Sequence, residues 1–128
     1  MPTWSEYKKT ARTRGSLAFE LYIVESTPAL RPDELSEILP DHLNYQKQME
    51  HAGKLFLAGP LSDASGEEMT GGGIIVYRAS SLNEAKEIAL NDPMHKRGGR
   101  TFTLRRWLVN EGSLSLSVGL SEQKVRLT

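Results

Sequence analysis

The chain of 128 residues contains no cysteine, so it forms no disulfide and offers no thiolate as a nucleophile or metal ligand. Sixteen acidic residues balance sixteen basic ones, which leaves no overall field to attract nucleic acid or anionic lipid. No stretch approaches the roughly 20 apolar residues of a membrane-spanning helix. The N-terminus also lacks the apolar run of a secretory signal peptide. These absences predict a cytoplasmic protein with neither a nucleic-acid nor a membrane partner.

Several sequence motifs are also absent. The histidines at positions 42, 51 and 95 show no His-x-x-x-His or His-Glu-x-x-His spacing, so we expect no metal. The chain has no Gly-x-x-x-x-Gly-Lys loop and no dinucleotide fingerprint, and we therefore expect no cofactor. It has no Gly-x-Ser-x-Gly, which argues against a hydrolase-type serine nucleophile.

The length and the composition, 38% hydrophobic and 25% charged, are typical of one globular domain spanning residues 1–128. Residues 1–15 are polar and basic, which predicts an N-terminal arm or a short helix. Residues 17–109 hold the alternating apolar patterns and make up the predicted core. Residues 113–128 are expected to form a C-terminal strand followed by a polar tail.

Apolar periodicity and turn residues predict two main helices and five strands. One helical segment begins near Asp33 and is expected to break at Pro40, with the main helix from there to His51. Another helix follows a Ser81–Glu84 capping box. The expected strands are 17–24, 54–58, 74–77, 100–109 and 113–118, with loops at 27–32 and, mobile or as a loose hairpin, at 61–73.

The order strand–helix–strand–strand–helix–strand predicts an α+β fold of the ferredoxin-like, split βαβ type, in which two helices cover one face of an antiparallel sheet. In the strand 100–109, Phe102 and Trp107 lie on opposite sides. The uncovered face would therefore expose apolar side chains in a monomer, and this predicts a homodimer. The extra C-terminal strand is expected to pair with a partner subunit or to extend the sheet edge.

Three short motifs bear on chemistry. His42 lies in Leu-Pro-Asp-His-Leu-Asn-Tyr, Asp92 lies in Asn-Asp-Pro-Met-His-Lys-Arg-Gly, and between them Gly59-Pro60 marks a turn that lets a ligand approach the backbone. In this order and at these intervals, from about residue 17 to residue 109, the chain resembles the YciI-like (YCII-related) family. That resemblance implies a dimeric α+β barrel in which His42 and Asp92 form a functional dyad.

The residues themselves leave other interpretations open. His42 fits a core-edge histidine that is satisfied by a backbone carbonyl as well as it fits a base. Asp92 is expected at the end of a helix, where the dipole disfavours a carboxylate, so it needs a partner such as His42 or Arg97. The Asp92–Pro93 pair is also a common turn. Likewise, Gly59-Pro60 fits a simple strand-ending turn.

A second group of residues is expected to contact a substrate. Ser62 follows the Gly-Pro turn, and the basic stretch after Asp92 suits an anionic small molecule, with Arg97 or Arg100 as a carboxylate clamp. Such a stretch is more often a solvated loop, and it is untypical of the family at this place. The predicted substrate-binding residues are Gly59, Pro60, Ser62, Met94, His95, Arg97 and Arg100.

The sequence therefore predicts a small cofactor-independent lyase or isomerase that acts by proton transfer on a small organic acid or lactone. His42 would be the general base or acid and Asp92 its orienting partner. One alternative is a non-catalytic ligand-binding or accessory dimer, and another is a cofactor-free oxygenase with a wide apolar cavity. A hydrogen bond from His42 to Asp92 that opens onto a cavity would favour catalysis, whereas a sealed His42 would favour a structural role.

Overall fold

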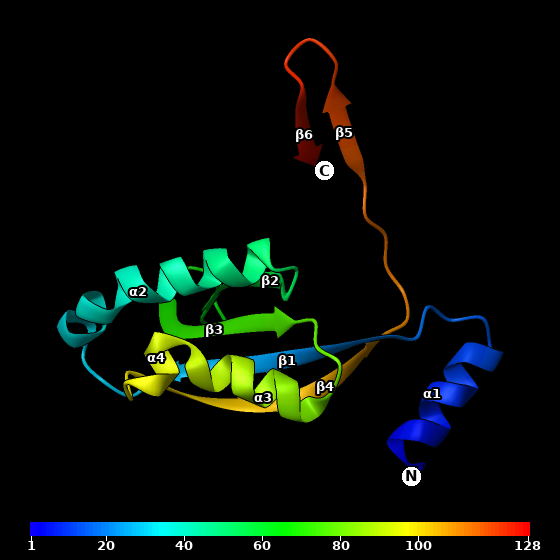
Figure 1. The fold of residues 1–128 in the computed structure, drawn as a ribbon, viewed down its shortest axis with the longest axis horizontal. Coiled ribbons are helices and arrows are strands. Elements are labelled where there is room, and N and C mark those ends of the chain that lie inside the picture. Colours follow the sequence, from blue (N-terminus) through cyan, green and yellow to red (C-terminus); the bar gives the residue numbers. More distant parts are fainter. The chain divides into compact units, whose positions relative to one another are not determined.

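The structure is a computed structural model that describes residues 1–128, and Figure 1 shows its elements. In chain order these are α1 (Trp4–Thr13), β1 (Phe19–Pro28), α2 (Pro32–His51), β2 (Leu55–Ser62), β3 (Met69–Tyr77), α3 (Leu82–Asn91), α4 (Pro93–Lys96), β4 (Arg100–Val109), β5 (Leu116–Gly119) and β6 (Lys124–Leu127).

The chain divides into two compact units, and Glu20–Leu108 forms the larger one. Its sheet has the strand order β2-β3-β1-β4, and β3 pairs antiparallel with both β1 and β2. This is the strand order of the ferredoxin-like split βαβ fold, so the predicted α+β class is confirmed. None of the helices has the length and apolar character needed to cross a bilayer.

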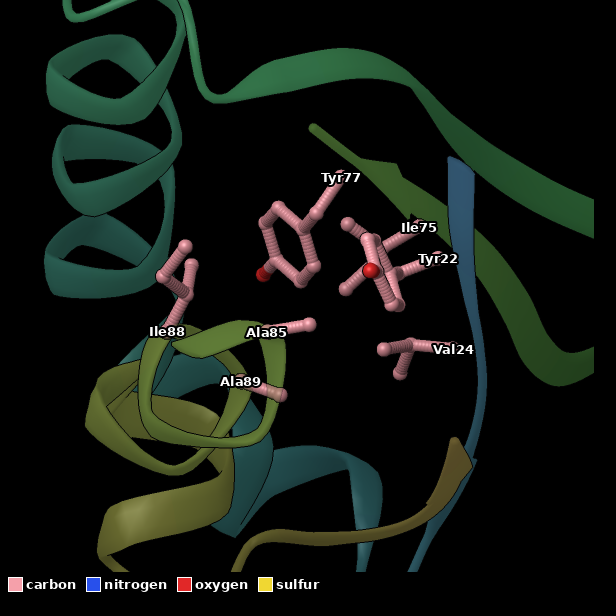
Figure 2. Close-up of a cluster of buried hydrophobic side chains, with 7 residues drawn as sticks. All are labelled: Tyr22, Val24, Ile75, Tyr77, Ala85, Ile88 and Ala89. Carbon is pink, nitrogen blue, oxygen red and sulfur yellow. The ribbon is translucent and has the colours of Figure 1, made fainter. Parts of the chain in front are cut away.

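The core of this unit lies between the sheet and the helices. Tyr22 and Val24 of β1 and Ile75 and Tyr77 of β3 point from one sheet face toward the buried side of α3 (Figure 2). That side of α3 is formed by Ala85, Ile88 and Ala89. Met49 of α2 and Phe102 and Leu104 of β4 pack against the same cluster. Both long helices of this unit therefore contribute to a core on a single face of the sheet.

Helix α2 is continuous from Pro32 to His51, and the predicted break at Pro40 is wrong. Proline lacks the N–H that would bond to the carbonyl four residues earlier, here that of Ser36. Both residues are exposed, so water can hydrate that carbonyl while the helix continues. His42 therefore lies inside a 20-residue helix, where its backbone is held on both sides.

Strands β1 and β2 are both longer than predicted. β1 continues through Thr27 to Pro28, which the sequence suggested was a loop. β2 does not close at Gly59-Pro60, because these residues pair with Ile74 and Gly73 of β3. A proline is tolerated there because β2 is an edge strand, so its missing N–H breaks no bond to a further strand.

The segment from residue 61 to residue 73, predicted as a mobile loop or a loose hairpin connection, is largely a hairpin. β2 ends at Ser62, β3 begins at Met69, and Asp63 organises the turn by accepting bonds from the Ser65 backbone N–H and hydroxyl. Gly71, Gly72 and Gly73 belong to β3. This stretch of β3 therefore carries no side chains, which leaves space beside the sheet.

The second unit comprises Met1–Phe19 and Val109–Thr128. Helix α1 begins with a capping box between Thr3 and Glu6. Near the C-terminus, β5 pairs with β6 in a separate two-stranded sheet. The predicted fifth strand therefore exists, but it does not extend the main sheet. Its registered pairs Leu116–Leu127 and Val118–Val125 give this hairpin one apolar face.

Candidate active site

His42 and Asp92, which are 50 positions apart in the sequence, meet inside the larger unit. The Nδ1 atom of His42 lies 2.8 Å from Oδ1 and 2.9 Å from Oδ2 of Asp92. The Asp92 side chain is fully buried, whereas that of His42 is 15% exposed. The distance falls within the hydrogen-bond range expected for a dyad. The structure therefore brings together the two residues that the sequence predicted would pair.

Asp92 ends α3 as predicted, but the structure adds a second helix end at the same residue. It follows α3, but it is also the N-cap of the short helix α4, and its Oδ1 accepts the Met94 backbone N–H at 2.9 Å. Pro93 takes the first helical position, where its missing N–H costs nothing. The start of α4 therefore supplies a donor to the carboxylate, which offsets the unfavourable end of α3.

The hydrogen-bond pattern determines which nitrogen of His42 is available. An ionised carboxylate only accepts hydrogen bonds. Nδ1 of His42 therefore carries the proton, and its N–H donates a hydrogen bond to Asp92. In the neutral ring Nε2 is then the basic nitrogen. Asp92 thus holds the imidazole in a single tautomer, with Nε2 as the atom that can take up a proton.

His42 borders a cavity of about 360 Å³. This volume is near the lower end of the range for small-molecule sites. Gly71, Gly72 and Gly73 of β3 form part of the wall, together with Leu43 and Gln46 from α2. An added Cβ at Gly71, where φ is +84°, would lie 2.9 Å from Pro28 Cγ. The other lining residues are Ser26, Leu39, Ala58, Gly59, Pro60, Ile74, Ile75, Met94 and Arg100.

Four of the seven predicted substrate-binding residues line this cavity, namely Gly59, Pro60, Met94 and Arg100. The other three do not. Ser62 donates its hydroxyl to the Asp63 carbonyl at 2.9 Å. Arg97 forms an exposed ion pair with Asp41 at 2.9 Å and borders a separate polar hollow beside Tyr45. His95 does not line the cavity, and its ring packs on that of Phe102 with 4.5 Å between the centroids.

A chain of hydrogen bonds connects Arg100, Ser26 and His95. Arg100 Nε donates to Ser26 Oγ at 2.8 Å, and Ser26 Oγ lies 2.8 Å from His95 Nε2. His95 Nδ1 lies 2.8 Å from the Ala89 carbonyl, which can only accept. Burial lowers the pKa of His95, while the Ala89 bond and the charge of Asp92 oppose that shift. The ring is therefore neutral, with its proton on Nδ1.

Ser26 is the residue of this network that the sequence interpretation missed. It is buried and follows Tyr22 and Val24 at the two-residue spacing of the core-facing side of β1. A serine on the apolar side of a strand needs a hydrogen-bond partner inside the protein. That alternation was visible in the sequence and could have identified Ser26.

Two tyrosines respond to the charge of Asp92. Burial and then the Asp92 carboxylate raise the pKa of Tyr45 to about 12. The same two causes, in the same order, raise the pKa of Tyr77 well above its usual value. The Tyr45 hydroxyl donates to the Ile88 carbonyl at 2.6 Å, whereas the buried Tyr77 hydroxyl has no hydrogen-bond partner. Both phenols are therefore neutral near physiological pH.

Comparisons with known proteins agree with this architecture. A family model described as the YCII-related domain matches residues 18–108. An uncharacterized protein of Bacillus subtilis (strain 168), YjpA, is 32% identical over 71 residues, which are 56% of this chain and 76% of that protein. Among solved structures, 5-chloro-2-hydroxyhydroquinone dehydrochlorinase (TftG) from Burkholderia phenoliruptrix AC1100, in complex with 2,5-dihydroxybenzoquinone, is similar at a TM-score of 0.51 and 25% identity. That match covers 68% of this chain and 92% of the dehydrochlorinase.

Proposed function

Because the chain belongs to the YCII-related domain family, we propose that it is a cofactor-independent lyase or isomerase that transfers a proton on a small organic acid or lactone. The observation that carries this proposal is the 2.8 Å bond between His42 and the buried Asp92 at the wall of a cavity. A His42 sealed away from the cavity would instead have favoured a structural role.

In the proposed reaction, His42 Nε2 removes an acidic proton from the bound substrate. The electron pair left behind forms a π bond. In a lyase the leaving group departs with its bonding electrons, and in an isomerase the proton returns at another carbon. Asp92 stabilises the imidazolium that forms, as the carboxylate does in hydrolase triads. Positioned proton transfer of this kind contributes about 10²–10⁴ in rate.

The similar solved structure supports this class of reaction. Its name describes a dehydrochlorinase, an enzyme that removes hydrogen chloride, and its bound ligand is a small oxygenated ring. Loss of hydrogen chloride requires one proton transfer and one departing halide, and a histidine base can drive it without a cofactor. The cavity of about 360 Å³ suits a ligand of this size.

The test uses 5-chloro-2-hydroxyhydroquinone and simple lactones as candidate substrates. Chloride release and deuterium uptake from D₂O would be measured for the wild type, His42→Asn and Asp92→Asn. His51→Asn is the matched control, because His51 is an exposed histidine at the end of the same helix.

We expect His42→Asn to lower turnover by about 10²–10⁴, the usual contribution of a general base. Asp92→Asn should lower it by about 10² or more, because an amide N–H facing Nδ1 favours the tautomer with the proton on Nε2. His51→Asn should retain wild-type turnover. A wild type that binds these compounds without releasing chloride or exchanging protons would instead support a ligand-binding role.

A further inference from the structure

Arg100 is a half-buried cation at the cavity wall that has no carboxylate partner. The charge of Asp92 acts on it, but the oxygens of Asp92 already accept bonds from His42 and Met94. Removing a guanidinium from water costs free energy unless an anion or good acceptors replace the water. The wall of this cavity therefore contains one unpaired positive charge.

The protein holds Arg100 in place through neutral acceptors only. Nε donates to Ser26 Oγ at 2.8 Å, and Nη2 donates to the Ser26 carbonyl at 2.9 Å and to the Gly71 carbonyl. A guanidinium has five N–H donors. These bonds use three of them, so the two on Nη1 have no partner in the protein. The anchors thus fix the orientation of the group without neutralising its charge.

Ser26 is itself held by His95. Because the His95 proton is on Nδ1 and bonds to Ala89, His95 Nε2 must accept, and the Ser26 hydroxyl donates to it. The lone pairs of Ser26 Oγ are then available to Arg100 Nε. Every proton in this chain of bonds has one assigned position, so the guanidinium is held in a fixed orientation before any ligand binds.

We propose that Arg100 binds an anionic oxygen of a small cyclic substrate, a delocalised oxyanion such as a phenolate, an enolate or a vinylogous carboxylate. In this proposal Ser26 and His95 are positioning residues. It rests on the proposed function, because it places the same substrate between Arg100 and His42. When His42 removes a proton, the Asp92 carboxylate stabilises the imidazolium. The Arg100 guanidinium stabilises the negative charge left on the substrate.

The probe for this inference is 2,5-dihydroxybenzoquinone. Each of its hydroxyl groups is conjugated through a C=C bond to a carbonyl, so the compound is a vinylogous acid and is ionised at neutral pH. 2,5-Dimethoxybenzoquinone has the same ring without an ionisable oxygen, and benzoate presents an ordinary carboxylate. Titration calorimetry at low salt would give the affinity for each of the three.

The variants separate a specific contact from general charge. Arg100→Gln removes the cation, and Arg105→Gln is its matched control, because Arg105 lies on the same strand but is exposed and pairs with Glu25. We expect Arg100→Gln to weaken binding of the dihydroxyquinone at least tenfold, and Arg105→Gln to change it less than twofold. Neither variant should alter binding of the dimethoxyquinone. Ser26→Ala should reduce the preference for the charged over the neutral quinone, whereas a merely structural loss would weaken both equally.

Equal effects of Arg100→Gln and Arg105→Gln would overturn the proposal, as would a wild type that prefers the neutral quinone or benzoate. If Arg100→Gln does not fold, Arg100→Lys replaces it. The lysine keeps the charge but loses the planar fork, so the expected loss of affinity is severalfold, and unchanged affinity counts against the proposal.

His42→Asn should bind the dihydroxyquinone within threefold of the wild type while losing turnover. Turnover that survives in His42→Asn refutes the proposed function alone, and normal binding by Arg100→Gln refutes this inference alone.

Discussion

At the scale of single residues, the two tyrosines near Asp92 differ in their hydrogen bonds: the Tyr45 hydroxyl makes one and the Tyr77 hydroxyl makes none. The Ile88 carbonyl lies in the last turn of α3, where carbonyls lack helical partners, and the Tyr45 hydroxyl satisfies it at 2.6 Å. The Tyr77 hydroxyl is buried in the core without a partner. A buried polar group that makes no hydrogen bond costs roughly 1–3 kcal/mol.

We therefore expect opposite results from the same substitution at these two positions. Tyr77→Phe should stabilise the protein by about 1 kcal/mol, and Tyr45→Phe should destabilise it by about 1 kcal/mol. Urea denaturation curves of both variants, with unchanged slopes, would measure this. A loss of stability in Tyr77→Phe would mean that the hydroxyl makes a compensating bond in solution.

The sequence was most informative where a single side chain carries the chemistry. His42 and Asp92 were identified from short motifs together with a family resemblance, and the structure joins them by a hydrogen bond. The electrostatic argument for Asp92 was incomplete, because Asp92 ends α3 as expected but is also the N-cap of α4. The alternation in β1 could have identified Ser26 as a buried serine, but its partners, about 70 positions away, could not be read from the local sequence.

At the scale of elements, close approach of α2 to the start of β4 depends on Gly99. A Cβ added there would lie 2.9 Å from Ile38 Cδ1 and 3.2 Å from Leu35 Cδ2, both on α2, and 3.3 Å from the Met94 carbonyl. Gly59 differs, since it has no positive φ and no atom within 4 Å of an added Cβ. Gly59 was predicted to lie in a turn, but it lies inside strand β2.

Gly99→Ala should therefore destabilise the protein by about 1–3 kcal/mol, the usual cost of overpacking. Gly59→Ala should leave stability unchanged or raise it slightly, because alanine loses less backbone entropy than glycine in a strand. Thermal unfolding of the two variants under the same conditions checks this comparison. Similar melting temperatures for both variants would show that α2 can move away from Gly99.

Element boundaries were the least predictable feature of the fold. Pro40 and Gly59-Pro60 were both interpreted as stops, yet one lies inside a helix and the other inside an edge strand. Proline removes one donor, and it ends an element only where that donor is needed and water cannot replace it. Exposure and strand order decide this, and neither can be read from the local sequence.

At the scale of the whole molecule, the sheet face opposite α2 and α3 carries apolar side chains. On that face Val76 of β3 is buried, but its registered partner Leu57 of β2 is 54% exposed and Trp107 of β4 is 42% exposed. We propose that two copies of the chain associate through this face, because an apolar patch of this kind is rarely left in water.

Sedimentation at micromolar concentration should show a dimer, and Trp107→Asp should shift it to monomer. Leu90→Asp is the control, since Leu90 is similarly exposed, at 45%, but lies on α3. A wild-type monomer, or equal effects of the two substitutions, would contradict dimerisation through this face.

The C-terminal hairpin was not anticipated from the sequence, because its second strand, Lys124–Leu127, lies in a segment that was interpreted as a polar tail.

The central claim is that Asp92 holds His42 with its proton on Nδ1 and leaves Nε2 free to accept one. Two-bond ¹H–¹⁵N correlation spectra of the imidazole ring, recorded where the ring is neutral, report the tautomer directly and need no substrate. We predict a protonated Nδ1 and an unprotonated Nε2 for His42 in the wild type, and a shift toward the Nε2-protonated form in Asp92→Asn. A wild-type His42 with its proton on Nε2, or identical spectra for wild type and Asp92→Asn, would contradict the account.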